Sequence, residues 1–239
     1  RVGVGQAVER GFGFEIDIYL SKDKRLFTFH DRDLTRTTGG ACTNLCTEAS
    51  WEETVSKVNV GGWGKWKGSK YDPTRPALLE DVLELARSGR KIYCEVKGND
   101  PSWAPYIREV FAKCPKANPD TVLFITFGDR ICRALKDTMP EYKTFFLIRA
   151  SRPDAKVGTI PFTADELIEK LRSTKADGLD ICYNSEHHTP EFIRKVKDAG
   201  YEFHVWTIDD PAKAAEAFSR GVDTVTTNRA KYIYDARNR

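Results

Sequence analysis

Glu15 and Asp17 are the first residues whose types and spacing suggest chemistry. They alternate with apolar residues in the segment FEIDIY, which predicts a strand with both carboxylates on one face. Two carboxylates on one face repel each other and usually face water or a cation that neutralises them. After the turn SKDK, a short apolar run ends at His30 and predicts the second strand of a hairpin. Glu15, Asp17 and His30 are therefore expected within one hairpin, where the carboxylates could bind a cation.

The segment 91–98, with the sequence KIYCEVKG, repeats this arrangement. Its apolar residues alternate with Glu95 and Lys97, which share the opposite face. Three carboxylates, from Glu15, Asp17 and Glu95, would repel strongly at neutral pH unless a hard cation held them. Oxygen ligands of this kind suit Mg²⁺ or Ca²⁺ and do not suit zinc. The alternative interpretation is that Glu15 and Asp17 are solvated strand ends and that Glu95 and Lys97 form an ion pair.

Helical and strand patterns alternate strictly along the rest of the chain, which is typical of a parallel sheet with helical crossovers. Strands are expected at 91–98, 121–127, 142–150, 177–183, 201–208 and 222–228, and helices at 77–89, 102–114, 129–138, 163–174, 190–199 and 211–220. With the strand around residue 16, seven strands begin such units.

The fold favoured by this alternation is a (β/α)₈ TIM barrel, which typically takes about 250 residues. Such a barrel requires eight strands, one more than the seven predicted here. Residues 1–11 resemble the tail of a helix, so we expect the first strand of the barrel to lie before Arg1. An open doubly wound sheet is the second choice, but the chain contains no Gly-x-Gly-x-x-Gly turn. We expect one barrel domain over residues 1–239.

Overall charge and hydropathy exclude several classes of protein. Lys and Arg outnumber Asp and Glu by 38 to 35, and a net charge of +3 is too small to indicate nucleic acid or an anionic membrane as the partner. The sequence has no apolar run of the roughly 20 residues that would predict a transmembrane segment. Residues 1–11 lack the apolar core of a signal peptide. The compartment, cytoplasmic or exported, and the oligomeric state stay open.

The cysteines also leave the compartment open. Cys94 and Cys182 lie in predicted strands, where cysteine usually acts as a small buried hydrophobe. Cys42 and Cys46 are the one pair close enough in sequence to bridge a loop, and a disulfide or two free thiols are equally compatible with the sequence.

The remaining aromatic and histidine residues have structural alternatives. His187 and His188 are expected to be solvated loop residues, and His204 to be packed in the core. Trp206 is either a core residue or an apolar wall of the substrate pocket. Residues 60–76, rich in Gly, Trp and Lys, predict a loop. Its part from Gly61 to Lys70 either covers the pocket or contacts a polar head group, or it is a surface loop with tryptophans packed beneath it.

Three segments, in the same order, resemble the glycerophosphodiester phosphodiesterases, whose fold is a TIM barrel. The segment 13–40 resembles the family's Glu-x-Asp strand, turn and His-Asp signature ahead of an Arg-Thr-Thr loop. The segment 94–98, CEVKG, resembles its Glu-x-Lys strand. The segment 204–230 resembles its Trp-Thr strand, helix and Gly-Val-Asp final strand. The resemblance covers nearly the whole chain.

The resemblance implies metal-dependent hydrolysis of a small glycerophosphodiester to an alcohol and glycerol 3-phosphate. Glu15, Asp17 and Glu95 would hold the divalent cation, Mg²⁺ or Ca²⁺. His30 would be one of two catalytic histidines, with its unperturbed pKa close to the working pH. Lys97 would contact the phosphate and stabilise its growing negative charge.

The chain also departs from the family pattern. Family members carry His-Arg-Gly and Glu-Asn-Thr segments that should precede Arg1, and the last motif reads Thr-Thr-Asn where Thr-Asp is usual. Either an N-terminal piece precedes this sequence or the protein lacks half of its acid–base pair. Trp206 lies in the segment that resembles the Trp-Thr strand and would contact substrate.

Three other functions compete with this hypothesis. The first is a related phosphodiesterase that acts on lysophospholipids, which an exposed apolar patch would favour. The second is a barrel that binds a phosphodiester without cleaving it. The third is an unrelated isomerase or aldolase that uses Lys97 as a base, but a lysine beside Glu95 should keep a high pKa, which argues against that role.

Overall fold

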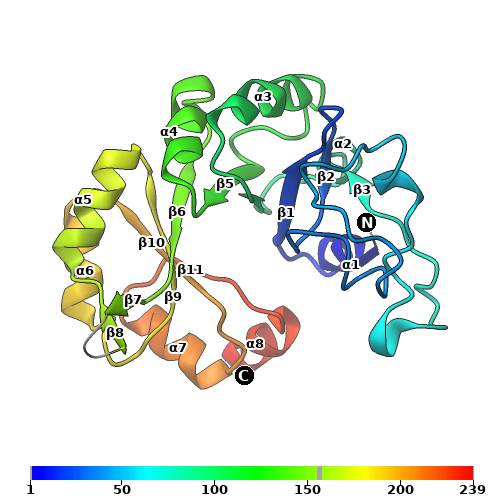
Figure 1. Cartoon of the computed structure of the whole chain (residues 1–239). Coiled ribbons are helices and arrows are strands. Elements are labelled where there is room, and N and C mark those ends of the chain that lie inside the picture. The colour runs from blue at the N-terminus through cyan, green and yellow to red at the C-terminus, as the bar shows by residue number, and fades with distance from the viewer. Residues whose placement is uncertain (1, 155–157, 239) are drawn as a thin grey trace. The chain divides into compact units, whose positions relative to one another are not determined.

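The structure is a computed structural model that describes residues 2–154 and 158–238, without the side chains of residues 2–4 and 154. The chain forms two compact units. The first unit contains residues 1–98 and 102–122, and the second contains residues 99–101 and 123–239. Figure 1 colours both units by position along the chain.

The first unit is built around a four-stranded sheet with the order β4-β1-β2-β3. Its elements in chain order are α1 (Val2–Glu9), β1 (Phe14–Leu20), β2 (Leu26–Thr28), the 3₁₀ helices η1 (Val55–Lys57) and η2 (Gly64–Trp66), β3 (Ala77–Leu78), α2 (Leu79–Leu83), β4 (Ile92–Val96), η3 (Pro101–Trp103) and α3 (Ala104–Ala112). Strand β1 runs parallel to β4 and antiparallel to β2, and β2 pairs antiparallel with β3. The parallel register places Asp17 directly opposite Glu95.

Alternation along β1 separates its two faces, as the sequence pattern predicts. Ile16, Ile18 and Leu20 are buried in the core of the first unit, and Glu15 and Asp17 point to the other face. Strand β4 is buried along its whole length, so Glu95 is a buried charged residue. Such a residue needs a charge partner or a ligand, because burial strongly disfavours an unpaired charge.

The second unit holds five parallel strands in the order β5-β6-β9-β10-β11. These strands are β5 (Val122–Thr126, whose first residue belongs to the first unit), β6 (Thr144–Ile148), β9 (Gly178–Cys182), β10 (Glu202–Trp206) and β11 (Thr224–Val225). Its helices are α4 (Asp129–Thr138), α5 (Ala164–Thr174), α6 (Pro190–Asp198), α7 (Pro211–Ser219) and α8 (Ala230–Arg237). Figure 1 shows α4 to α7 flanking these strands, and α4, α5, α6 and α7 pack on β6, β9, β10 and β11 respectively.

Local signals at the helix ends account for the boundaries in the second unit. Thr163 and Glu166 form a reciprocal capping box at the start of α5. Thr189 caps α6 and Asp210 caps α7, each with a side chain that accepts a backbone N–H group of the first turn. The apolar faces of these helices cover a buried core that includes Leu171, Leu179, Phe203 and Val205.

All seven strands that the alternation predicted are present, but one expected helix is shorter and two further features were not predicted. The helix expected at 77–89 is only Leu79–Leu83, because Ala77 and Leu78 are extended and pair with β2. The segment between β6 and α5 contains a two-stranded hairpin of β7 (Ser151–Asp154) and β8 (Gly158–Pro161), and helix α8 follows β11.

Two further expectations concern cysteines and membrane-spanning segments. All six cysteines are free thiols, including Cys42 and Cys46. Among the described residues, no helix combines the length and the apolar character needed to cross a bilayer.

Candidate active site

Three carboxylates of the first unit converge on one face of the β1–β4 pair. Each of Glu15, Asp17 and Glu95 offers an oxygen atom, and these oxygens lie within 4.8 Å of one another. Asp17 and Glu95 meet because the register of the parallel strands places them side by side. Glu15 joins them because it lies two residues before Asp17 on the same face. The structure thus brings together the three residues for which the sequence predicted a shared cation.

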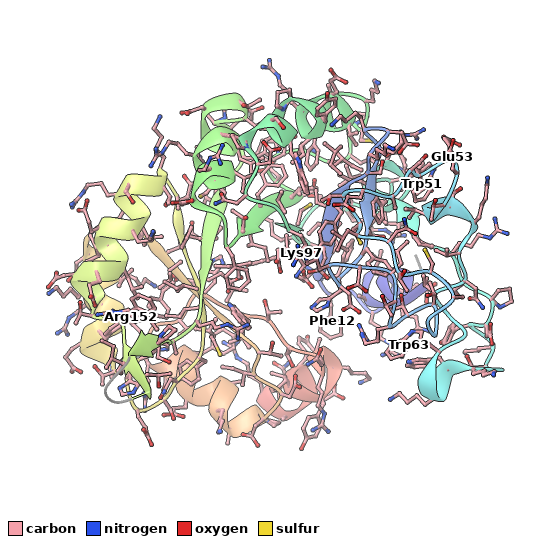
Figure 2. The ribbon with its side chains drawn as sticks, in the orientation of Figure 1. Phe12, Trp51, Glu53, Trp63, Lys97 and Arg152 are labelled. Atoms are coloured by element: carbon pink, nitrogen blue, oxygen red, sulfur yellow. The ribbon has the colours of Figure 1, made fainter. Side chains whose placement is uncertain are left out.

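Lys97 is the counter-charge of this cluster. Its Nζ lies 2.7 Å from Asp17 Oδ1 and 2.9 Å from Glu95 Oε1, and Figure 2 shows the side chain beside β1. Burial disfavours the charged lysine, but the two carboxylates outweigh burial and raise the pKa of Lys97. Lys97 is therefore a fixed cation at neutral pH. This protonation state argues against the isomerase or aldolase hypothesis, which requires a neutral lysine.

The carboxylates of the cluster lie close enough to repel one another. Lys97 pairs with two of them, Asp17 and Glu95, whose side chains are only 13% and 11% exposed. Burial raises the pKa of Glu95, and Lys97 opposes this effect only in part. Three carboxylates this close together, one of them buried, are therefore the unusual feature of this region, because neighbouring negative charges away from water are costly.

A divalent cation fits the donor set. Oxygen ligands bind Mg²⁺ or Ca²⁺ at about 2.0 to 2.6 Å, so oxygens on one ion lie at most about 5 Å apart. The 4.8 Å limit within the cluster meets that requirement. Glu15, Asp17 and Glu95 could together hold one such ion, and its charge would offset the repulsion between them.

His30 lies two residues beyond β2 and is largely exposed, with 71% of its side chain accessible. Its Nδ1 lies 2.9 Å from Asp31 Oδ1. Arg36 donates to the same carboxylate from Nε at 2.6 Å and from Nη2 at 2.8 Å. Hydrogen bonding to Arg36 is the main reason that the pKa of Asp31 falls to about 2. Asp31 is therefore ionised over the physiological range and accepts the Nδ1 proton of His30.

Trp206, the substrate-contact candidate, belongs to the second unit. It lies at the carboxyl end of β10, where its indole N–H donates to the carbonyl oxygen of Asp180 at 3.0 Å. Phe127 packs edge-on against its ring, with 6.0 Å between the ring centres. The indole is partly exposed, and its contact with substrate stays a prediction.

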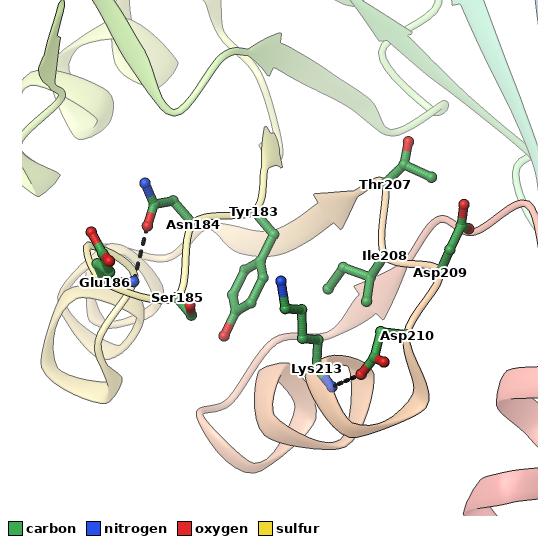
Figure 3. Close-up of a pocket in the computed structure, with 9 residues that line it drawn as sticks. All are labelled: Tyr183, Asn184, Ser185, Glu186, Thr207, Ile208, Asp209, Asp210 and Lys213. Atoms are coloured by element: carbon green, nitrogen blue, oxygen red, sulfur yellow. Dashed lines mark hydrogen bonds between the residues drawn. The ribbon is translucent and has the colours of Figure 1, made fainter.

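A cavity of about 510 Å³ lies in the second unit between the loops that follow β9 and β10 (Figure 3). Residues after Trp206 line one side of it, and Lys213 of α7 points into it. Tyr183 and Asn184 line the other side. In parallel α/β sheets, ligands bind at the carboxyl ends of strands, and this polar lining suits a polar ligand. The sequence analysis did not single out this cavity, because it depends on two loops distant in sequence.

The second unit contains three histidines, for which two expectations were correct and one was wrong; His187 is exposed as predicted. His204 is buried as predicted, stacked on Phe145 with 4.1 Å between ring centres. His188, expected to be solvated, is 1% exposed and packs against Tyr183 and Phe192. Its Nδ1 accepts the backbone N–H of Asn184 at 3.2 Å, and burial lowers its pKa to about 4.

Three residues linked to the predicted site residues were given no role by the sequence analysis. Asp31 and Arg36 hold His30, and the Asp directly after His30 was the available signal. Tyr19 shares the face of Glu15 and Asp17, and burial raises its pKa to about 12, so it stays a neutral phenol beside the cluster. Its position at the next alternate residue after Asp17 could have identified it.

The comparison with models of known protein families identifies the family of this chain. The model of the glycerophosphoryl diester phosphodiesterase family matches residues 4–231. The chain belongs to this family. The match extends over both units and confirms the resemblance found in the sequence.

Individual relatives of the family are distant in sequence. A glycerophosphodiester phosphodiesterase of Bacillus subtilis is 22% identical over 231 residues, which cover 90% of this chain and 72% of that protein. The glycerophosphodiester phosphodiesterase domain-containing protein 4 of Mus musculus is 25% identical over 249 residues. Those residues are 92% of this chain but only 35% of the mouse protein.

Solved structures of the family show the same fold. A phosphodiesterase of Oleispira antarctica, solved with its product sn-glycerol-3-phosphate, has a TM-score of 0.76 at 23% identity, covering 100% of this chain and 90% of its own. A glycerophosphodiester phosphodiesterase of Parabacteroides distasonis has a TM-score of 0.73 at 20% identity, covering 98% and 86%. The fold class is thus the α/β TIM barrel that the strand alternation predicted.

Proposed function

We propose that this chain hydrolyses glycerophosphodiesters to an alcohol and glycerol 3-phosphate with the help of a divalent cation. The observation that carries the proposal is the cluster of Glu15, Asp17 and Glu95, whose carboxylate oxygens lie within 4.8 Å of one another on one face of the β1–β4 pair. The Oleispira relative, which holds sn-glycerol-3-phosphate, supports the identity of the product. We further propose that the two units act as one catalytic domain over residues 1–239.

In this proposal Glu15, Asp17 and Glu95 hold the cation, Mg²⁺ or Ca²⁺, which supplies Lewis-acid stabilisation of the phosphate charge when bound. Lys97 binds a phosphate oxygen. Its raised pKa keeps it protonated, so it can stabilise negative charge that grows as the phosphorus becomes five-coordinate.

His30 acts as the general acid or base at an oxygen of the scissile bond. Because Asp31 engages Nδ1, the neutral imidazole carries its proton there, and Nε2 remains free to accept or return a proton. Its exposure leaves the ring open to a substrate. Trp206 provides an apolar wall for the part of the substrate that does not react.

Release of glycerol 3-phosphate from glycerophosphocholine tests the activity. We expect turnover with Mg²⁺ or Ca²⁺, loss of turnover with a chelator, and recovery when the metal is restored. Turnover that persists in chelator would refute the metal dependence. Binding of glycerophosphocholine without turnover would instead favour the non-catalytic phosphodiester-binding barrel.

A lysophospholipid is the second candidate substrate. The observation that favours it is an exposed tryptophan, Trp66, on a loop of the first unit, because a water-soluble diester requires no exposed apolar surface. Comparing turnover of lysophosphatidylcholine with that of glycerophosphocholine separates the two substrates.

A further inference from the structure

Residues 61–71 form a compact surface loop with a fixed base, called here the Trp-Lys loop. At its base, the N–H of Val60 donates to the carbonyl oxygen of Thr74 at 2.7 Å. The side-chain oxygen of Asn59 accepts from the N–H groups of Gly61 at 2.9 Å and Thr74 at 3.0 Å. A Cβ atom on Gly61 would overlap the carbonyl oxygen of Tyr71, so the closure requires glycine. These contacts hold the two ends of the loop together and leave its tip at the surface.

The tip of the Trp-Lys loop is cationic. The loop contains Lys65, Lys67 and Lys70 and no acidic residue, and all three lysines are exposed. The nearest acid in sequence, Asp72, accepts from the N–H of Gly68 and from the side chain of Asn59, both at 2.8 Å. The carboxylate of Asp72 is thus held by hydrogen bonds from Gly68 and Asn59.

Aromatic rings lie between these lysines. Trp66 is 39% exposed and packs edge-on against Tyr71, with 5.8 Å between ring centres. The Nζ of Lys65 lies 5.2 Å from the centre of the Trp66 ring, and the Nζ of Lys70 lies 5.1 Å from that of Tyr71. Tryptophan and tyrosine between lysines are the side chains that favour the boundary between water and acyl chains.

The base of the Trp-Lys loop also contacts the residues that hold His30. The guanidinium of Arg36 lies over the ring of Trp63, 4.4 Å from its centre, and Figure 2 labels this tryptophan. The same guanidinium donates to Asp31, whose carboxylate engages His30. A surface bound at the loop would therefore lie in the part of the first unit that carries the candidate catalytic histidine.

These features favour a lipid surface over a nucleic acid or an acidic protein. The net charge of the whole chain, only +3, indicates neither a nucleic acid nor an anionic membrane, so the choice of partner depends on the loop itself. The positive charge of the loop is local, and a bilayer that contains anionic lipids meets it with a matching charge. The exposed indole, which contributes little to a purely ionic contact, gains from burial in the interface.

We propose that the Trp-Lys loop binds the surface of bilayers that contain anionic lipids, with Trp66 in the interface and the lysines at the headgroups. This binding goes beyond the proposed hydrolysis and does not depend on it. It would place the chain beside a lipid substrate or product.

Sedimentation with vesicles tests the proposal. The parent chain is mixed either with vesicles of phosphatidylcholine alone or with vesicles that also contain phosphatidylserine, and the bound fraction is measured. We expect binding to the anionic vesicles, weak binding to the neutral vesicles, and release by added salt. The double variant Lys65→Gln/Lys67→Gln should bind the anionic vesicles roughly 30-fold more weakly, and Trp66→Ala roughly tenfold more weakly.

Helix α8 offers a matched control. Tyr232 is 49% exposed with the guanidinium of Arg229 over its ring, and Lys231 pairs with Asp235 at 2.7 Å. The variant Lys231→Gln/Tyr232→Ala removes the same kinds of side chain and should bind like the parent. A parent chain that does not bind anionic vesicles, or a loop variant with a native circular dichroism spectrum that binds as well as the parent, overturns the proposal. Tighter binding of an oligonucleotide than of anionic vesicles also overturns it.

Vesicle binding is measured without substrate, so its result is separate from that of the hydrolysis assay. A chain that binds anionic vesicles but does not release glycerol 3-phosphate supports the docking surface and refutes the proposed activity. The converse result leaves the activity and refutes the docking surface.

Discussion

The charged groups of the two units are arranged differently. In the first unit, three carboxylates gather within 4.8 Å of one another, and Lys97 pairs with two of them. In the second unit, carboxylates near the amino ends of the strands each pair with a separate lysine: Asp177 with Lys136 at 2.8 Å, Asp223 with Lys197 at 2.6 Å, and Glu202 with Lys143. Separate ion pairs of this kind need no ligand, whereas three clustered carboxylates suit a cation.

The matched pairs also bind backbone groups. Asp177 accepts the N–H of Thr144 at 2.8 Å, and Asp223 accepts the N–H of Phe203 at 2.9 Å. Each carboxylate thus joins two neighbouring strands of the sheet. In barrels, the amino ends of the strands contribute stability and the carboxyl ends contribute chemistry. The clustered carboxylates of the first unit and the separate ion pairs of the second unit agree with that division.

The largest expected effect comes from removing a carboxylate of the first unit, with a carboxylate of the second unit as the control. We expect Glu95→Gln to lower kcat/KM for glycerophosphocholine by about 10³-fold and to weaken metal binding, because a cation ligand is lost. Glu202→Gln should leave both unchanged and only lower the unfolding temperature. Activity assays and calorimetric metal titration measure these effects. Equal activity in the two variants would contradict the assignment of Glu95.

The buried histidine of the second unit should make stability depend on pH. Burial lowers the pKa of His188 from 6.5 to about 4, which corresponds to about 3 kcal/mol. Its contribution is fully present above pH 6.5 and is lost as the pH falls toward 4, because the folded state resists the proton that the unfolded state takes up.

Urea unfolding of the parent and of His188→Gln at several pH values measures this contribution. Glutamine can still accept the N–H of Asn184 but does not titrate. The variant should therefore lose less stability than the parent between pH 7 and pH 4.5. Parallel pH profiles for the two proteins would show that His188 does not cause the loss.

A comparison of two exposed histidines, His30 and His187, tests the catalytic role of His30. His30→Ala should lower turnover by about 10²-fold while metal binding and the unfolding temperature stay unchanged, because its side chain is largely exposed. His187→Ala, also at an exposed position, should retain full activity. A His30→Ala variant with parental turnover would remove the proposed acid–base role.

A smaller effect is expected from the groups that hold His30. Asp31→Asn should lower kcat by about tenfold, because the imidazole loses the carboxylate that orients it and fixes its tautomer. Since the pKa of Asp31 is about 2, the parent carboxylate stays ionised above pH 4. The pH–rate profile of the parent should therefore show no transition from Asp31 above pH 4. A variant Asp31→Asn with the kcat of the parent would contradict the positioning role of Asp31.

The sequence by itself determined the strand alternation, the TIM-barrel class and the face that carries Glu15, Asp17, Glu95 and Lys97. These features follow from the period of two along a strand and from the order of strands and helices, both of which are local properties. The parallel register that places Asp17 beside Glu95 agrees with that expectation.

Only the tertiary structure decided the environments of loop residues. His187 and His188 are adjacent in sequence, yet the first is exposed and the second lies against Phe203 and Phe192. Arg36 reaches both Asp31 and Trp63 for the same reason, because contacts of loop side chains depend on segments distant in sequence. Periodicity does not encode such contacts; packing of the whole unit does.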